Sequence, residues 1–148
     1  MMSNAAVEAA KDATQPTPAQ GWSTACQPSI QASIIIVNFN GGDKVLRCLA
    51  SVIRSVDQND EIIIIDNAST DGSVEAIAAG FPHLILIRSQ ANSGFGAGNN
   101  LGARRARGEY LVFLNPDTLV EAGWLEALLA SLEANPRAGL ATAKVLLA

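Results

Sequence analysis

Asparagine and aspartate residues follow three of the aliphatic runs in this sequence, and their oxygen atoms are the groups most suited to chemistry. Asn38 and Asn40 follow the first run, Asp66 and Asn67 follow the second, and Asn-Pro-Asp at 115–117 follows a later one. Carboxylate and amide oxygens accept hydrogen bonds and bind hard cations. Asn and Asp are also ordinary turn and cap residues after a strand. Agreement among three strand ends favours a binding site over three unrelated turns.

The elements that must position these residues are strands alternating with helices. Aliphatic runs of four or five residues predict strands, and apolar residues at three- and four-residue spacing predict helices. Parallel strands need crossover connections, so the predicted fold class is α/β with a mostly parallel sheet. The predicted strands cover 33–37, 61–65, 84–87 and 110–114, and the predicted helices cover 43–56, 74–79, the second half of 91–108, and 124–132.

In an open α/β sheet, ligands bind beyond the carboxyl ends of the strands. All of the Asn and Asp residues named above fall on that edge. The strand entrances, at Gln31, Glu61 and His83, show no comparable polar grouping. We therefore expect the site at the carboxyl edge. Asp43 and Asp71 are expected to cap helices instead.

Composition excludes several classes of function. Ten basic and fourteen acidic side chains give a net charge of −4, which argues against a nucleic-acid partner. We expect the arginines at 104, 105 and 107 to be a solvated helix end beside a Gly108 cap, with phosphate steering as the alternative. The lone His83 gives little support to a histidine base or a His-rich metal site.

Two further features concern the setting of the chain. Cys26 lies in the presumed tail and Cys48 in a helical pattern, and two cysteines so placed do not make a disulfide framework or a metal site, which predicts a reducing, cytoplasmic setting. No apolar run approaches the ~18 residues that a membrane span needs. Residues 1–30 are polar and punctuated by proline, so we expect a flexible tail before a single domain at 31–148.

The glycine-rich stretch at 91–108 matches neither common phosphate-binding motif. Asn99 stands where the dinucleotide fingerprint G-x-G-x-x-G requires its third glycine, and no Gly-Lys-Ser/Thr completes a P-loop. These glycines could bring the backbone close to a ligand or a neighbouring element, and a purely structural turn is an equal alternative.

Three ordered segments resemble the nucleotide-binding half of family 2 glycosyltransferases. They read SIIIVNFN, EIIIIDNASTDGS and NSGFGAGNNLGARRARGEYLVFLNPD, between residues 33 and 118. The resemblance implies the Rossmann-like half of a GT-A fold. It also implies binding of a nucleoside-diphosphate sugar, and transfer of that sugar with inversion to a glycan or lipid-linked acceptor.

The resemblance also implies roles for individual residues. Asp66 is similar to the carboxylate that contacts the base or ribose, and the loop at 38–40 flanks the same nucleotide. Asp117 is similar to the acid that binds Mg²⁺ or Mn²⁺, which would bridge it to the diphosphate. The remaining residues that the matched motifs assign to nucleotide-sugar binding are Asn38, Asn40, Asn67, Asn92, Gly94, Asn99 and Asn115.

The chain departs from the family pattern in two respects. Residues 115–117 replace the usual acidic D-x-D and leave one carboxylate, a form similar to rhamnosyl- and galactofuranosyltransferases and suggestive of a dTDP- or UDP-linked donor. The second concerns the general base of inverting transfer, which the family places in the second half of the domain. We therefore expect a truncated chain without that base, with Glu121, Glu126 and Glu133 on a solvated helix face.

Two alternatives to an enzyme of this family stay open. One is a non-catalytic α/β module that binds a nucleotide or pairs with another chain through an exposed sheet edge. The other, a sugar-nucleotide pyrophosphorylase, is weaker because a basic, glycine-rich motif is absent after the first strand. Lipid-linked acceptors would fit peripheral membrane association, although no basic amphipathic helix in the chain supports it.

Overall fold

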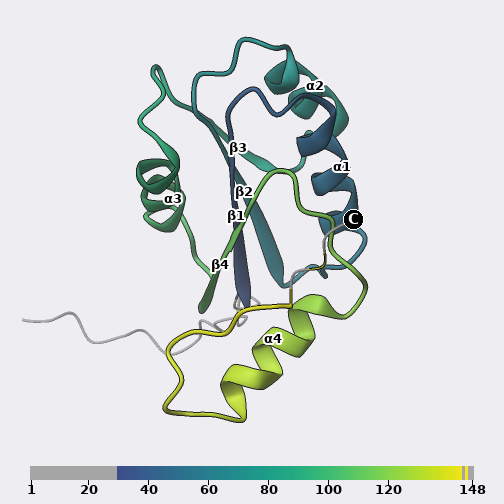
Figure 1. Ribbon diagram of the computed structural model, residues 1–148, viewed down its shortest axis with the longest axis vertical. Coiled ribbons are helices and arrows are strands. Elements are labelled where there is room, and N and C mark those ends of the chain that lie inside the picture. Colours follow the sequence, from purple (N-terminus) through teal and green to yellow (C-terminus); the bar gives the residue numbers. More distant parts are fainter. Residues whose placement is uncertain (1–29, 145, 147–148) are drawn as a thin grey trace, which may run out of the picture.

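The computed structural model describes residues 30–144 and residue 146. The predicted tail at 1–30 therefore lies almost wholly outside the described residues. Strands and helices alternate through the described chain (Figure 1). The elements are β1 (Ala32–Asn38), α1 (Gly42–Ile53), β2 (Asp60–Asp66), α2 (Ser73–Gly80), β3 (Ile85–Arg88), α3 (Phe95–Ala103), β4 (Tyr110–Leu114) and α4 (Trp124–Glu133).

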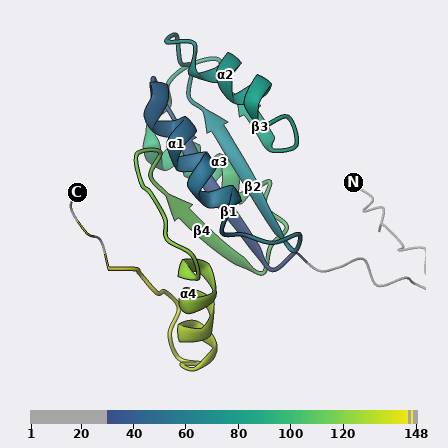
Figure 2. The same cartoon turned by 90° about the vertical axis from the view of Figure 1, so that its right-hand side faces the viewer.

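The four strands form one parallel sheet in the order β3-β2-β1-β4. Figure 2 shows the arrows of β2 and β4 running in the same direction. The central strands β1 and β2 are buried along almost their whole length, which explains their unbroken aliphatic runs. The outer strands β3 and β4 are more exposed. The predicted α/β class with a parallel sheet is confirmed.

Helices cover both faces of the sheet. Figure 1 shows α1 and α2 on one face and α3 on the other. The first face buries a cluster that includes Ile34, Ile36, Ile62 and Ile64, and the second face buries a smaller cluster around Ile35 and Val37. Because successive side chains of a strand point to opposite faces, each isoleucine run supplies both layers of the core.

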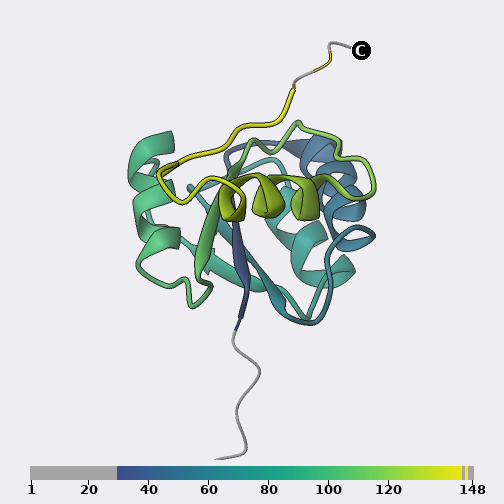
Figure 3. The ribbon, with the colours of Figure 1, turned by 90° about the horizontal axis from the view of Figure 1, so that it is seen from below.

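Helix α4 lies across the end of the sheet at which the strands begin (Figures 1 and 3). Leu125 and Leu129 are its buried residues and join the core cluster of α1. The Trp124 indole N–H donates to Ser55 Oγ at 2.8 Å, and the Val120 N–H donates to Ser51 Oγ at 3.2 Å. Serine side chains in α1 and just after it therefore anchor the start of α4 and the segment that leads into it. No helix within the described ranges is long and apolar enough to cross a membrane.

Three expected helix boundaries are wrong. Helix α1 begins at Gly42 with Gly41 at its N-cap, so Asp43 lies in the first turn and does not cap, and the helix ends before Val56. Helix α3 ends at Ala103, so Gly108 is not its cap. The Gly108 N–H instead donates to Ser33 Oγ at 2.9 Å, and a Cβ at Gly108 would lie 2.6 Å from the Ser33 backbone nitrogen. Close approach of the segment before β4 to the backbone of β1, not helix termination, requires this glycine.

Candidate functional site at the carboxyl edge of the sheet

The ends of β1, β2 and β4 meet at one edge of the sheet, as the sequence predicts. Asn38, the last residue of β1, is paired with Asp66, the last residue of β2. On the other side of β1, Ile36 is paired with Leu114, which directly precedes Asn115. The three loops that follow these strands therefore leave from neighbouring positions, and β1 separates the Asp66 loop from the 115–117 loop.

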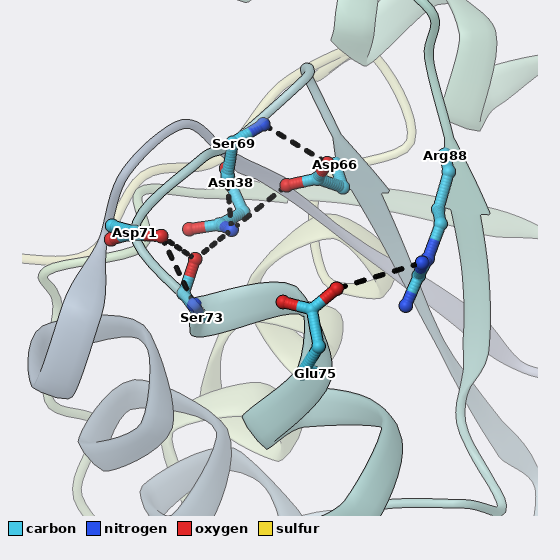
Figure 4. Close-up of polar contacts among 7 residues, drawn as sticks. All are labelled: Asn38, Asp66, Ser69, Asp71, Ser73, Glu75 and Arg88. Carbon is cyan, nitrogen blue, oxygen red and sulfur yellow. Dashed lines mark hydrogen bonds and ion pairs between the residues drawn. The ribbon is translucent and has the colours of Figure 1, made fainter.

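Asn38 and Asp66 belong to one buried hydrogen-bond network (Figure 4). The amide nitrogen of Asn38 lies 3.1 Å from Asp66 Oδ1, 3.1 Å from Ser69 Oγ and 2.9 Å from Ser73 Oγ. The Ser69 N–H donates to the other carboxylate oxygen of Asp66 at 3.2 Å. Asp66 is 3% exposed. Its carboxylate is therefore buried, and each of its oxygens is held by one protein donor.

The loops after β1 and β2 are also tied to each other directly. The Asn40 N–H donates to Ser69 Oγ at 2.9 Å, and the Thr70 N–H donates to Asn40 Oδ1 at 2.8 Å. Asn40 is exposed and adopts a left-handed backbone conformation with φ of 52°. Asparagine tolerates this conformation better than most residues. Asn40 thus lies at the surface of the site on a fixed backbone.

Asp71 joins the first turns of two helices. Its carboxylate accepts hydrogen bonds from the N–H of Ser73, the first residue of α2, at 3.0 Å, and from the N–H of Gly42, the first residue of α1, at 2.9 Å. The side-chain hydrogen bond from Ser73 is the main cause that lowers the pKa of Asp71, and these two N–H groups add to it. Gly72 is the N-cap residue of α2, so Asp71 lies one position before the expected cap, and its carboxylate accepts from the first N–H group of both helices.

Asn67 connects the end of β2 to the glycine-rich loop. Its amide nitrogen donates to Asn92 Oδ1 at 2.7 Å and to the Gly94 carbonyl at 3.2 Å, and its oxygen accepts from the Ser93 N–H at 3.1 Å. Gly94 has φ of 86°, a conformation that favours glycine. Asn67 is buried, whereas Asn92 and Gly94 are exposed. The structure thus brings this loop to the same edge as Asp66.

The loop at 115–117 lies over α1. Asn115 and Asp117 are exposed, and the thiol of Cys48 on α1 lies 3.6 Å from the Asn115 carbonyl. Burial raises the pKa of the Cys48 thiol to about 11, and the nearby Asp117 carboxylate adds to this effect. Asn99 on α3 is partly buried, and its side-chain oxygen has no hydrogen-bond partner among the described residues. The described residues contain no group of three or more His, Cys, Asp or Glu side chains that could hold a metal ion.

The sequence reasoning missed the serines of this edge. Ser69 and Ser73 complete the network around Asn38, and neither stands among the residues expected to form the site. Their position in a loop rich in Asn and Asp was the available signal. The neighbouring ion pair between Glu75 and Arg88 spans 3.7 Å between exposed side chains, so it contributes little (Figure 4).

The opposite edge of the sheet carries a polar cluster that was not expected. The Glu61 carboxylate accepts from Ser33 Oγ at 2.7 Å, from the Arg107 N–H at 2.6 Å and from the Arg107 guanidinium at 2.8 Å. Burial alone would raise the pKa of Glu61, but these hydrogen bonds outweigh it and the pKa is lowered. Arg104 and Arg105 are exposed at the end of α3 as expected, but Arg107 lies beyond the helix and, although exposed, pairs with Glu61.

Comparisons with known proteins agree with this geometry. The family model described as "Glycosyl transferase family 2" matches residues 33–145. The "Uncharacterized glycosyltransferase YibD" of Escherichia coli is 38% identical over 100 residues, which cover 66% of this chain and 29% of that protein. An "N-acetylglucosaminyl-diphospho-decaprenol L-rhamnosyltransferase" of Mycobacterium tuberculosis is 28% identical over 117 residues, covering 72% of this chain and 38% of that protein.

A solved structure shows the same fold. The crystal structure of Staphylococcus aureus TarS 1-349 in complex with UDP-GlcNAc superposes with a TM-score of 0.65 at 21% identity, covering 72% of this chain and 32% of that one. The chain thus spans about a third of the length of these relatives and of this structure. The predicted GT-A type of α/β fold is confirmed by this likeness.

Proposed function

Because the chain belongs to glycosyl transferase family 2, we propose that the carboxyl edge of its sheet binds the nucleoside-diphosphate sugar from which a sugar is transferred. The observation that carries the proposal is the convergence of three strand-end loops on one edge. Ligands of open α/β sheets occupy this position. The acceptor that we propose is a glycan or a lipid-linked glycan, and the transfer proceeds with inversion at the sugar.

The nucleoside end of the donor is assigned to Asp66 and the loops around it. The Asp66 carboxylate has its orientation set by hydrogen bonds from Asn38 and Ser69, and each of its oxygens keeps a second lone pair for a nucleoside donor. Asn40 and Asn92 offer exposed amides on either side of Asp66. A site of fixed, oriented oxygen and nitrogen atoms suits the hydroxyl and ring groups of a nucleoside.

The diphosphate end is assigned to the loop at 115–117. Asp117 supplies an exposed carboxylate and Asn115 an exposed amide, which suits a Mg²⁺ or Mn²⁺ ion that takes most of its ligands from phosphate and water. When bound, such an ion would offset negative charge on the leaving diphosphate. Cys48 supports this loop from below through the Asn115 carbonyl.

The donor that we propose is UDP- or dTDP-linked. The Asn-Pro-Asp form of the 115–117 loop resembles rhamnosyltransferases, and one relative carries a rhamnosyltransferase name. The structure in complex with UDP-GlcNAc belongs to a protein of the same fold. We assign no general base to the described residues. This chain matches about a third of the length of its relatives, and we propose that the base lies in the part of such proteins that it does not match. The buried free thiol of Cys48 supports a reducing, cytoplasmic setting.

Calorimetric titration of the chain with UDP and with dTDP, with and without Mn²⁺, tests the proposal. We expect at least one nucleotide to bind, Asp66→Ala to weaken binding with or without metal, and Asp117→Ala to abolish only the gain that Mn²⁺ provides. Glu126→Ala, on the exposed side of α4, is the matched control and should bind like the wild type. A folded wild-type chain that binds neither nucleotide would refute the donor site.

A further inference from the structure

Asn38 has no atom available to a ligand. It is 0% exposed at the end of β1, and its amide nitrogen faces three acceptors, on Asp66, Ser69 and Ser73. Its amide oxygen accepts from the Gly41 N–H at 3.2 Å. A side-chain amide offers two N–H donors and one carbonyl oxygen, so the protein itself uses all of its hydrogen-bonding groups. Any influence of Asn38 on a ligand must pass through these neighbours.

The orientation of the Asn38 amide is fixed by its partners. The Ser73 hydroxyl donates to Asp71 Oδ1, so its oxygen must accept from the Asn38 nitrogen (Figure 4). A reversed amide would place the Asn38 oxygen against the Asp66 carboxylate and would direct N–H groups toward the Gly41 N–H. Both contacts would be repulsive, and their burial would make them costly. Asn38 therefore presents donors to Asp66 at all times.

The Asp66 carboxylate depends on this donor. One of its oxygens accepts from Asn38 and the other accepts from the Ser69 N–H, and Ser69 is itself held by Asn38. Resting on the proposed function, in which Asp66 contacts the nucleoside, we propose that Asn38 is a positioning residue that fixes the Asp66 carboxylate and the 66–73 loop for donor binding without touching the donor. A buried hydrogen-bonded residue of this kind limits the motion of the group that does touch the ligand.

The substitution Asn38→Asp tests this role with almost no change in shape. Two carboxylates would then face each other, which disfavours ionisation of both and removes the side-chain donor of Asp66. At lower pH, one proton shared by the pair restores a donor between them. Asp71 is the other carboxylate of the network, and the hydrogen bond from the Ser73 side chain is the largest cause that lowers its pKa. Asp71 therefore stays ionised at the pH values at which the Asn38→Asp pair gains its proton. Asn38→Ala removes the donor without adding a charge.

The experiment compares UDP and dTDP affinities of the wild type, N38D and N38A at about pH 7.5 and about pH 5, each relative to the wild type at that pH. We expect N38D to lose about tenfold or more at the higher pH and to regain most of it at the lower pH. N38A should lose a similar factor at both pH values. Asn100→Asp, an exposed amide-to-acid change on α3, should match the wild type at both.

The outcomes separate this role from the proposed function. Absence of UDP and dTDP binding by the wild-type chain would overturn the proposed function and the role of Asn38 with it. Two results would overturn the role of Asn38 alone, provided that the wild type binds. One is an unchanged affinity in N38D, and the other is a loss of affinity in N38D that a lower pH does not reverse. If N38D does not fold at the higher pH, Asn38→Ser replaces it, and a folded N38S that binds like the wild type would overturn the role equally.

Discussion

Single residues at the carboxyl edge are held by neighbours that lie far apart in the sequence. Asn38 and the three acceptors of its amide nitrogen are separated by 28 to 35 positions, and Asn67 and Asn92 by 25. Amide and carboxylate groups that are buried and fully hydrogen-bonded have one preferred arrangement. The side chains of this edge are thus oriented before any ligand arrives, which lowers the entropic cost of binding.

Cys48 provides a residue-scale prediction for the 115–117 loop. Its thiol is buried and has a pKa of about 11, so only ~0.1% is thiolate at a pH of about 8, and the thiolate is the reactive form. In a Cys26→Ser background, we expect the thiol reagent DTNB to react slowly with the native protein and rapidly in denaturant. Absorbance of the released product follows both rates. Native and denatured rates of similar size would contradict the burial of Cys48 beneath this loop.

At the scale of elements, α3 lies close to the sheet because of two glycines. A Cβ at Gly98 would lie 2.8 Å from Val37 Cγ1, and a Cβ at Gly102 would lie 2.5 Å from Ile35 Cγ2. Both glycines are buried, and the other glycine of the helix, Gly96, is exposed. The glycine-rich sequence thus serves the packing of α3 on β1 as well as the loop that precedes it.

The substitution Gly102→Ala is expected to destabilise the fold by about 1–3 kcal/mol, because Ile35 is fully buried and must shift to admit a methyl group. Gly96→Ala is the matched control. No heavy atom lies within 4 Å of its Cβ, so higher helix propensity should stabilise the fold by up to ~1 kcal/mol. Urea unfolding measures both changes. Equal free energies of unfolding for the two variants would contradict the close packing of α3 on β1.

The elements themselves could be read from the sequence because strands buried on both faces have unbroken aliphatic runs. The isoleucines at 34–36 and 62–65 predicted β1 and β2, and their alternation with helical spacing predicted a parallel sheet. The burial of Asn38 and Asn67 could not be predicted, because it depends on which loop packs over each strand end. The pairing of Glu61 with Arg107 likewise depends on the path of the chain between α3 and β4, which no local pattern specifies.

At the scale of the whole molecule, we assign ligand binding to one edge of the sheet and stabilisation of the fold to the other. The proposed donor site occupies the carboxyl edge, whereas Glu61, Ser33 and Arg107 tie the strand entrances together at the other. Because the pKa of Glu61 is lowered in the folded chain, its carboxylate stabilises the fold above its unfolded pKa of about 4.3. That contribution is lost as the pH falls through the folded pKa.

The substitution Glu61→Gln should therefore cost about 1–3 kcal/mol of unfolding free energy near neutral pH, and the difference from the wild type should shrink below a pH of about 4. Urea unfolding at a series of pH values measures this difference, with exposed Glu109→Gln as the control. Nucleotide affinity should not change, since Glu61 lies at the opposite edge. A difference that persists undiminished in acid would show that the charge of Glu61 is not what stabilises the fold.

The hydrogen bonds between the loops after β1 and β2 limit which changes of loop length the fold can accept. Asn40 exchanges hydrogen bonds with Ser69 and Thr70, and Asp71 accepts from Gly42. An insertion or deletion in either loop would move donors away from acceptors in the other. Length changes here would need a compensating change some thirty positions away, so we expect these two loops to be inherited as a matched pair.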